Sequence, residues 1–307
     1  MACVPCRRRF PVSGNVPLLY WHAGPDRSRA DVTEAVKAFY EKTPFPNYDE
    51  CDDVGSLIQK ARRGIFARLL DEQIPFGCRI LECGCGTGQL SNFLSVAGRT
   101  VIGTDISLNS LKLAQEFKER NHLRRAYFLQ MNLFQPVVKR ESIDLVICNG
   151  VLHHTADPYL GFRSIARLVK PNGYILIGLY HKYARLLTDF RRCFFRLDRG
   201  MFEFLDSRLR EGISGEKKKN AWFADQYMHP HESKHTIREV RRWFLETGFE
   251  FVTSVPRSGI FSSFQENERI FQPEKPGAVA LFARELLMSV THSHDGGLFM
   301  VIGKKKV

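Results

Sequence analysis

The chain has 307 residues, 44% of them hydrophobic and 25% charged, which is typical of a soluble globular protein with one large domain or two. Its longest apolar runs, 174–180 and 278–290, are interrupted or far short of the ~20 residues that a membrane span needs, so we expect no transmembrane helix. The sequence shows no secretory signal, and its eight cysteines form no compact disulfide framework; both observations favour the cytoplasm.

Basic residues outnumber acidic ones by 45 to 33, for a net charge of +12. Such an excess fits a nucleic acid, an anionic lipid surface, an acidic substrate, or solubility alone. Because the surplus gathers in 185–210, 217–219 and 304–306, we interpret it as solvated faces and a basic tail. Nucleic acid is therefore the less favoured partner, and nothing in the sequence specifies an oligomeric state.

Two segments precede the main pattern of the chain. Residues 1–30 predict an arm, and residues 31–76 a helical cap with one helix over 31–42 and a second helical segment over 55–73. Cys3 and Cys6 have the spacing of half a zinc knuckle, and their surroundings resemble part of a Trm112-like zinc ribbon. A structural zinc site needs four ligands, and the other half is not in the sequence, so we predict no metal.

Residues 77–180 alternate between short β-branched apolar runs and helical patterns, which predicts a parallel sheet wound with helices. The expected strands are 79–83, 100–104, 126–131, 143–148 and 174–179. Ser107 caps a helix that extends to about residue 121, and Asp157 followed by Pro158 opens another whose apolar stripe reaches Val169.

The remaining residues predict an insertion and the end of the core. Residues 181–235, rich in Arg and Phe, indicate a helical lid. Thr236 and Glu239 form a capping box that opens a helix to about residue 247. Strands over 249–255 and 298–303 then complete the part of the core within 236–307, with a second insertion between them.

A glycine-dense turn follows the first expected core strand, over residues 84–88. Glycine lets the backbone turn at positive φ and approach a ligand closely. The dinucleotide fingerprint needs a glycine at the sixth position, which is Gln89 here, and the phosphate loop needs Lys after its last glycine, where Gln89 again stands. Both phosphate-binding motifs are therefore excluded.

Polar residues stand at the ends of the next three expected strands. Asp105 is placed to bind both hydroxyls of a ribose, and Asn132 with Leu133 to contact an adenine ring. Asn149 and Gly150 follow the fourth strand, where backbone carbonyls suit an ammonium group. Because ligands bind beyond the carboxyl ends of strands in an open α/β sheet, these residues predict one shared nucleotide-like site.

Together these motifs resemble class I S-adenosylmethionine (SAM)-dependent methyltransferases of the broad group that includes ubiquinone and menaquinone biosynthesis methyltransferases. The resemblance covers about 78–179 and includes the stretches 151–154 and 169–174. It implies a Rossmann-like α/β fold: a seven-stranded sheet with helices on both faces, an N-terminal helical cap and a helical insertion after the fifth strand. This sequence departs from the family pattern at two positions. Asn132 stands where the family more often has Asp, and Asn172 stands where it has Gly.

The resemblance also implies the cofactor SAM and a set of cofactor-binding residues: Glu82, Gly84, Cys85, Gly86, Thr87, Gly88, Asp105, Ile106, Asn132, Leu133, Asn149, Gly150 and Val151. Methyl transfer from a sulfonium needs mainly positioning, and a general base only if the nucleophile must lose a proton. His153 and His154 are the candidates for that base. Packing beneath the helix that starts at Asp157 is the structural alternative for one of them.

The acceptor is the least defined part of the prediction. Six residues are expected to contact it: Tyr40, Tyr48, Tyr180, Tyr227, His229 and His231. The last three belong, with Asp225 and His235, to a polar stretch that we interpret either as a loop facing the acceptor or as an ordinary surface loop. The exocyclic amines of DNA bases are disfavoured, because Asn149 is not followed by the Pro-Pro-aromatic motif of enzymes that methylate them.

We therefore predict a methyltransferase acting on an oxygen, carbon or nitrogen of a small-molecule or lipid-like acceptor, with peripheral membrane contact through the lid if its aromatic face is exposed. One alternative is a catalytically inactive SAM-binding partner of a biosynthetic complex. A remote alternative is a zinc metalloprotease using His231, Glu232 and His235, which needs both histidines one turn apart on a helix. Pro230 and the later start of the helix at Thr236 argue against that alternative.

Overall fold

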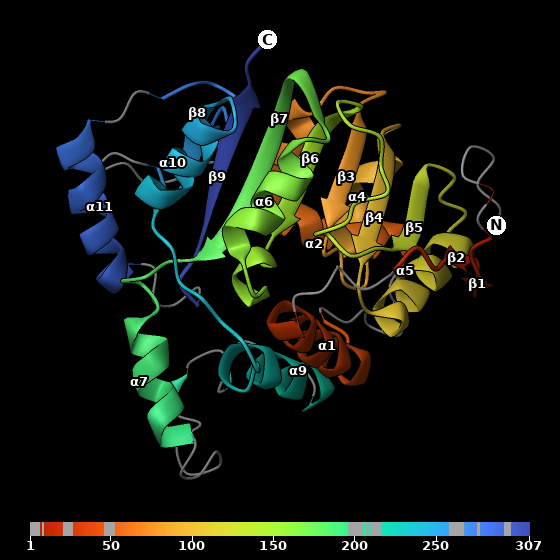
Figure 1. Cartoon of the computed structure of the whole chain (residues 1–307), viewed down its shortest axis with the longest axis horizontal. Coiled ribbons are helices and arrows are strands. Elements are labelled where there is room, and N and C mark those ends of the chain that lie inside the picture. Colours follow the sequence, from red (N-terminus) through yellow and green to blue (C-terminus); the bar gives the residue numbers. More distant parts are fainter. Residues whose placement is uncertain are drawn as a thin grey trace.

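A computed structural model describes residues 7, 9–20, 27–45, 53–195, 205–206, 209, 216–257, 267–274, 277–291 and 296–307. Its centre is a seven-stranded sheet in the order β5-β4-β3-β6-β7-β9-β8 (Figure 1). The strands are β3 (Arg79–Cys83), β4 (Thr100–Asp105), β5 (Ala126–Gln130), β6 (Ile143–Asn149), β7 (Val169–Tyr180), β8 (Phe249–Val255) and β9 (Leu298–Lys305). β3 to β7 pair in parallel, whereas β9 runs antiparallel to both β7 and β8. The expected α/β, Rossmann-like sheet is confirmed.

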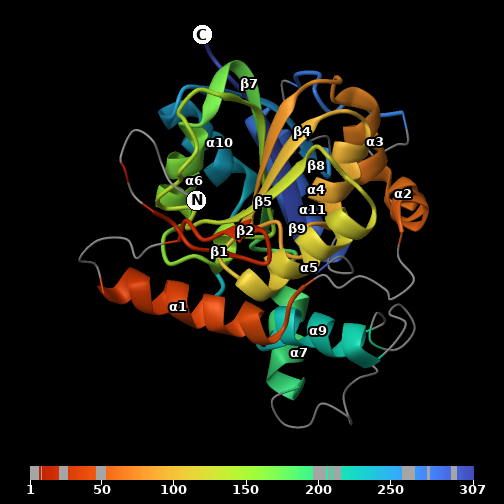
Figure 2. The same cartoon turned by 90° about the vertical axis from the view of Figure 1, so that its right-hand side faces the viewer.

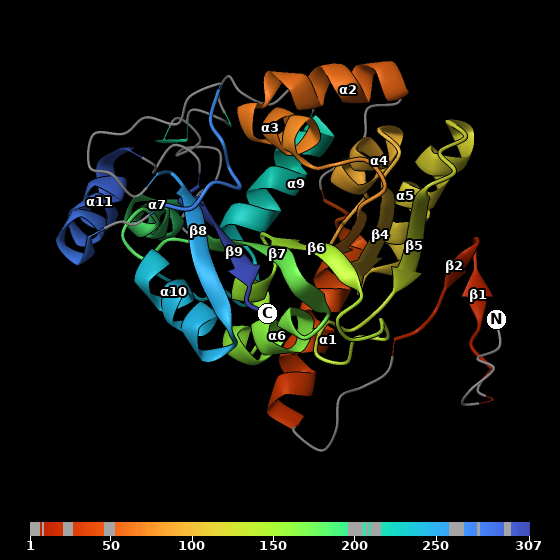
Figure 3. The same ribbon diagram turned by 90° about the horizontal axis from the view of Figure 1, so that it is seen from above.

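Helices cover both faces of this sheet. They are α1 (Arg27–Lys42), α2 (Val54–Arg63), α3 (Ile65–Gln73), α4 (Gln89–Val96), α5 (Leu108–Arg120), α6 (Pro158–Ala166), α7 (Leu186–Phe195), α9 (Glu216–Tyr227), α10 (Ile237–Glu246) and α11 (Ala278–Thr291). Figure 3 shows α2, α3 and α4 on one face and α6 and α10 on the other. Each face therefore buries its own apolar core, and the central strands are covered on both sides.

Two helices lie across the carboxyl ends of the parallel strands. Figures 1 and 2 show α1 and α9 beneath these strand ends, with α7 beyond them. The end of α1 is attached to the start of α5: the Glu41 carboxylate accepts hydrogen bonds from the backbone N–H groups of Leu108 and Asn109. A carboxylate is favourable at a helix N-terminus, because the free N–H groups and the helix dipole both attract negative charge.

Predicted caps and strands agree closely with the structure. The hydroxyl of Ser107 and the carboxylate of Asp157 accept backbone N–H bonds three residues onward, as helix N-caps do. Thr236 accepts from the N–H of Glu239, but the Glu239 carboxylate contacts His235 Nδ1 at 2.9 Å rather than completing the expected capping box. The strands predicted over 79–83 and 249–255 have the same bounds in the structure.

Three helix boundaries differ from those expected. The segment predicted over 55–73 is two helices, because the backbone of Gly64 is extended and interrupts the hydrogen-bond ladder between α2 and α3. The helix predicted to reach Val169 ends at Ala166, since Val169 pairs with Ile143 and begins β7. Finally, α1 begins at Arg27 rather than at residue 31.

The N-terminal arm contains a short hairpin of β1 (Val12–Ser13) and β2 (Val16–Pro17). After it, Leu18 pairs in parallel with Gln130 of β5, so the arm lies along the edge of the main sheet. Cys3 and Cys6, the residues of the suggested zinc ribbon, lie outside the described residues. In the part of the chain that is described, no helix has both the length and the apolar character needed to cross a bilayer.

Candidate active site

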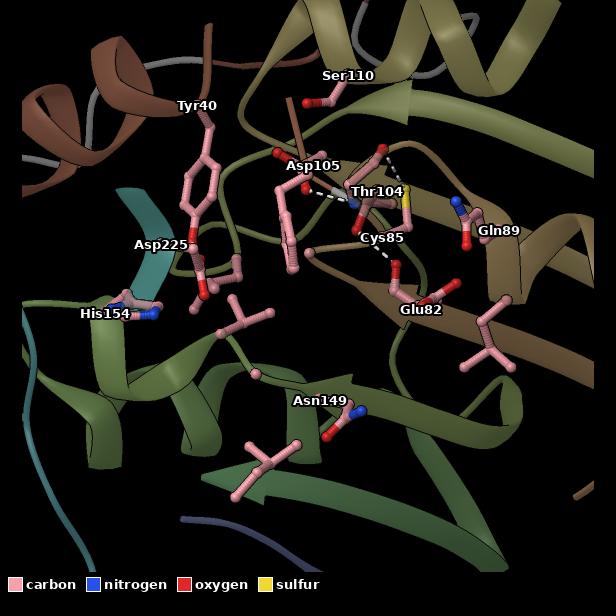
Figure 4. A pocket seen from close by; sticks show the side chains of 18 of the residues that line it. Tyr40, Glu82, Cys85, Gln89, Thr104, Asp105, Ser110, Asn149, His154 and Asp225 are labelled. Atoms are coloured by element: carbon pink, nitrogen blue, oxygen red, sulfur yellow. Dashed lines mark hydrogen bonds between the residues drawn. The ribbon is translucent and has the colours of Figure 1, made fainter. Parts of the chain in front are cut away.

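A cavity of about 770 Å³ lies at the carboxyl ends of the parallel strands, in the size range of small-molecule sites. Its walls come from the sheet, from α1 and α2, and from α9 of the lid. Figure 4 shows Asp105 and Glu82 on the sheet side and Tyr40, Asp225 and His154 opposite them. The cap and the lid thus complete a site that the sheet begins.

The glycine loop enters the cavity between β3 and α4. Gly84, Gly86 and Gly88 all have positive φ, which side chains with a Cβ rarely adopt. A Cβ on Gly84 would lie 2.2 Å from the Val151 side chain, and one on Gly88 2.6 Å from Ala114. The loop therefore needs glycine both for its conformation and for its close packing.

Asp105 closes the loop from the end of β4. One of its carboxylate oxygens accepts the N–H of Gly86 at 2.8 Å, and the other accepts the N–H of Ser107 at 2.9 Å. Burial raises the pKa of Asp105, although these backbone bonds oppose the shift. The side chain is therefore fixed in direction, and its remaining lone pairs can accept further hydrogen bonds.

Glu82 lies deeper, under the same loop. Its side chain is buried and accepts a hydrogen bond from the Ser91 hydroxyl of α4. Burial raises the pKa of Glu82 to about 7. The carboxyl group is thus poised between its neutral and ionised forms near neutral pH.

Two asparagines mark the ends of β5 and β6. Asn132 is buried, and its side-chain oxygen accepts the N–H of Phe134 at 3.0 Å, which orients the amide. Within the described part of the chain, the buried side-chain oxygen of Asn149 has no hydrogen-bond partner. Because an unpaired buried polar atom is costly, Asn149 is a site that a bound polar ligand could satisfy.

Most of the predicted cofactor residues lie on the cavity wall: Glu82, Gly84, Cys85, Gly86, Asp105, Ile106, Asn132, Leu133, Asn149, Gly150 and Val151. Thr87 and Gly88 are not on the wall. Thr87 is fully buried, and Gly88 caps α4 while its backbone packs beside Ala114. These two residues support the loop on its side away from the cavity.

The two candidate histidines differ sharply in position. His154 lines the cavity, and its Nδ1 lies 2.8 Å from the backbone carbonyl oxygen of His231. A carbonyl can only accept, so Nδ1 carries the hydrogen and Nε2 the lone pair. His153 is fully buried away from the wall, and neither of its ring nitrogens has a partner among the described residues. Burial lowers the pKa of His154 to about 4, so its imidazole is neutral at physiological pH.

Only some of the residues expected to contact the acceptor line the cavity. Tyr40 and Tyr180 line the cavity. His229 stands behind that wall, stacked on His154 with ring centroids 3.5 Å apart. Tyr227 points elsewhere and donates to Asp206 at 2.6 Å, and Tyr48 lies outside the described residues.

His231 reaches the site through its backbone, since its carbonyl oxygen is the group that orients His154. The interpretation of Asp225 and Tyr227 as loop residues is wrong. Both belong to helix α9, where Asp225 lines the cavity and Tyr227 does not. The hydrophobic contacts of Tyr227 with Phe195 and Phe223 hold that helix in the lid.

Sequence reasoning missed the main polar contact between the cap and the lid. Asp225, on α9, accepts a hydrogen bond from the Tyr40 hydroxyl of α1 at 2.8 Å and another from Gln226 at 2.9 Å. Tyr180, at the end of β7, donates to the same carboxylate at 3.4 Å. Asp225 and Gln226 also line the cavity. No local pattern reveals this cluster, because its members come from three distant parts of the chain.

The zinc-protease pattern has no helix to support it. Residues 231–235 run in an extended path, and the Glu232 carboxylate binds the guanidinium groups of Arg185 and Arg192. Burial alone would raise the pKa of Glu232, but the two guanidinium groups lower this pKa to about 2. His235 is bonded to Ser233 and Glu239 instead of facing His231. Among the described residues, no group of three or more His, Cys, Asp or Glu side chains is arranged to hold a metal ion.

The family model described as "Methyltransferase domain" matches residues 81–177, which span β3 to β7 and include the glycine loop and Asp105. These residues are therefore similar to a methyltransferase domain. SAM is the cofactor that goes with this domain and its fold.

Relatives extend beyond the methyltransferase domain. An uncharacterized protein of Synechococcus is 30% identical over 248 residues, which are 72% of this chain and 60% of that protein. A ubiquinone biosynthesis O-methyltransferase of Glaesserella parasuis is 30% identical over 117 residues, 36% of this chain and 48% of the relative. The matched regions thus span about half to three-fifths of these relatives.

The fold of the methyltransferase domain is shared with solved structures. The magnesium protoporphyrin IX methyltransferase of Synechocystis, determined with bound SAM, superposes with a TM-score of 0.51 at 17% identity and covers 93% of this chain and all of that one. PKMT2 of Rickettsia typhi gives a TM-score of 0.56 at 11% identity, over 78% of this chain and 52% of the other. At such identities the likeness concerns the fold alone.

The residues of the cavity fit SAM chemically. Gly84 and Gly86 present bare backbone on either side of Cys85, and the free lone pairs of the Asp105 carboxylate suit the hydroxyls of a ribose. The unpartnered oxygen of Asn149 suits a donor such as an ammonium group. The donor and acceptor groups on the wall therefore match those of an adenosyl and amino-acid ligand.

Proposed function

We propose that this chain transfers the methyl group of SAM to a hydroxyl oxygen of a small-molecule or lipid-like acceptor, rather than to carbon or nitrogen. The observation that carries the proposal is His154, a neutral imidazole on the cavity wall whose tautomer is fixed by the His231 carbonyl. A hydroxyl nucleophile must lose its proton during transfer, and an unprotonated Nε2 can accept it. The O-methyltransferase named among the relatives supports the same choice.

In this proposal the cofactor supplies an activated methyl group, and the chain holds the two reactants in line. Asp105 binds the ribose, Asn132 and Leu133 contact the adenine, and the 84–86 turn lies against the amino-acid portion. Tyr40, Tyr180 and Asp225 orient the acceptor hydroxyl next to His154. The cap and the lid keep water away from these groups, because α1 and α9 close the cavity over the strand ends.

The first test concerns the cofactor. Asp105→Ala removes the acceptor of the Gly86 N–H and the expected ribose contact, so S-adenosylhomocysteine (SAH) should bind about 10- to 100-fold more weakly, as for the loss of a charged hydrogen bond. Isothermal titration measures this, with exposed Asp31→Ala as the matched control. Equal affinity in wild type and Asp105→Ala would contradict the assignment.

The second test concerns the base. With labelled SAM and a panel of alkylphenols and alkylcatechols, His154→Asn should lower kcat by about 100-fold, the usual contribution of a general base. The same change at exposed His122 should leave kcat unaltered. A chain that binds SAH but methylates no acceptor would instead favour a non-catalytic binding protein.

A further inference from the structure

His154, the base of the proposed reaction, lies against a second imidazole that does not line the cavity. The rings of His154 and His229 stack with their centroids 3.5 Å apart and their planes 28° from parallel. The Nδ1 atoms of both rings also contact the same backbone carbonyl oxygen, that of His231, at 2.8 Å from His154 and 2.6 Å from His229. The two imidazoles therefore share one acceptor.

The shared carbonyl fixes the tautomer of His229 as well as that of His154. A carbonyl oxygen only accepts hydrogen bonds, and its two lone pairs can take one N–H from each ring. The N–H of His231 also lies near the Nδ1 of His229, but at 3.2 Å it is farther away than the carbonyl oxygen, so this Nδ1 carries a hydrogen. Burial lowers the pKa of His229 to about 3, so the ring is neutral near pH 7 and its Nε2 has the lone pair.

His229 also determines the direction of the shared carbonyl. Its bond to the oxygen two residues onward closes the segment 229–231 on itself, and Pro230 restricts the backbone between them. Ser233 anchors the same segment separately, by donating its N–H to the His153 carbonyl at 2.7 Å. Loss of the His229 bond should therefore release the His231 carbonyl without detaching the segment.

The cap holds His229 in this position. Phe39 and Tyr40 of α1 pack on the His229 ring, with centroids 5.0 and 5.5 Å from it. Figure 4 shows Tyr40 and His154 on the same side of the cavity. His153 contacts His154 too, at 4.2 Å and 66° between the planes, but its ring nitrogens have no partner in the described part of the chain. His153 therefore packs against the base, whereas His229 both packs and holds the hydrogen-bond acceptor of the base.

We propose that His229 is a positioning residue for His154: by holding the His231 carbonyl, it keeps the hydrogen of His154 on Nδ1 and the lone pair on Nε2. This inference rests on the proposed function, which it deepens by naming how the base is regulated. Residues 229–231 belong to the lid, and the cap packs on His229, so the base is complete only while lid and cap are both in place. An open lid would leave His154 free to exchange between its two tautomers.

The test observes the tautomer of His154 in the full, ligand-free chain labelled with nitrogen-15 histidine, near pH 7. Long-range proton–nitrogen correlation spectra distinguish protonated from unprotonated ring nitrogens, and the signals missing from His154→Asn identify this residue. In wild type His154 should show a protonated Nδ1 and an unprotonated Nε2. His229→Asn keeps an N–H donor near the position of Nδ1 and should keep this pattern. His229→Phe keeps the ring but has no donor, so the single pattern should be lost to a mixture of the two tautomers.

Met228→Phe, at the exposed neighbouring position, is the matched control and should keep the wild-type spectrum. Three results would overturn the inference: a protonated Nε2 on His154 in wild type, an unchanged pattern in His229→Phe, or a pattern lost in His229→Asn but kept in His229→Phe. The last would assign the effect to ring stacking alone. Urea unfolding reports whether each variant folds, and His229→Leu, which also lacks a donor, replaces His229→Phe if that variant does not. If His154→Asn methylated acceptors as well as wild type, the proposed function would fail while the tautomer result stood, so the two failures are distinguishable.

Discussion

At the scale of single residues, the site depends on carboxyl groups kept away from water. Glu82 is buried and Asp105 half-buried near the glycine loop, and desolvation raises the pKa of each. The Gly86 N–H and the Ser91 hydroxyl donate to these carboxyl groups but offset the effect of burial only in part. Their ionisation therefore costs free energy in the ligand-free chain, and a ligand that donates hydrogen bonds to Asp105 would recover part of it.

This cost predicts a pH dependence for the Glu82→Gln variant. The pKa of Glu82 is about 7 in the folded chain and ordinarily near 4.5. The folded state binds this proton more tightly, so its stabilising contribution is complete below about pH 4.5 and is lost as pH rises through 7. At pH 8, Glu82→Gln should be more stable to urea than wild type by about 3 kcal/mol, and at pH 4.5 the two should match.

The comparison must be a difference between variants, because other groups titrate with the opposite sign. Burial lowers the pKa of His154 to about 4 and of His229 to about 3, so protonation of these histidines favours the unfolded chain in acid. Glu116→Gln, at an exposed position on α5, is the matched control and should follow wild type at every pH. A constant offset for Glu82→Gln from pH 4.5 to 8 would refute the assignment.

At the scale of elements, the lid is held by one buried guanidinium. Arg185, at the start of the lid, binds Glu232, the side-chain and backbone oxygens of Gln226 and the carbonyl of Gly296. These partners belong to α9, to the strand-like segment before α10 and to the turn before β9. One side chain thus joins segments that are distant in the sequence.

Removing this guanidinium should destabilise the lid strongly. Arg185→Met should lower the free energy of unfolding by about 3 kcal/mol, because it breaks one of the two ion pairs of buried Glu232 and removes the donor from the Gln226 side-chain oxygen and the Gly296 carbonyl. Glu232 keeps its ion pair with Arg192 in this variant, so the double variant with Glu232→Met should recover none of the loss, because it also takes the Glu232 carboxylate from Arg192. Urea unfolding measures both, and exposed Arg124→Met should have little effect. A loss below 1 kcal/mol for Arg185→Met would count against this role.

The same elements show what the sequence could and could not predict. The strand ends, the glycine loop and the caps at Ser107 and Asp157 depend on local patterns, and they were predicted closely. The bond of Tyr40 to Asp225 and the pairing of Arg185 with Glu232 depend on contacts between distant segments. Nothing in the periodicity of either segment specifies its partner, so the wall of the acceptor site could be named only in part.

At the scale of the molecule, the cavity gathers side chains from Thr33 of α1 to Met300 of β9. A ligand in it contacts the cap, the core and the lid together. Its binding free energy should therefore stabilise all three as one unit rather than the methyltransferase domain alone.

SAH at 100 times its dissociation constant should raise the free energy of unfolding by about 2.7 kcal/mol. Hydrogen exchange should slow in α1 and α9 as well as in the 84–88 loop, because both helices line the cavity. Unfolding at several SAH concentrations and exchange by mass spectrometry provide the measurements. Protection confined to the loop, with α1 and α9 unchanged, would show that cap and lid fold independently of the ligand.

The position of β9 between β7 and β8 has a consequence for synthesis on the ribosome. Strand β8 is synthesised before β9, yet β9 is its partner in the sheet. β9 also pairs with the outer edge of β7. Until residues 298–305 emerge, the backbone groups along β8 and the outer edge of β7 stay unpaired and prone to pair with other chains. The nascent chain therefore has its glycine loop long before it has a finished sheet, and this interval is when it most needs protection from aggregation.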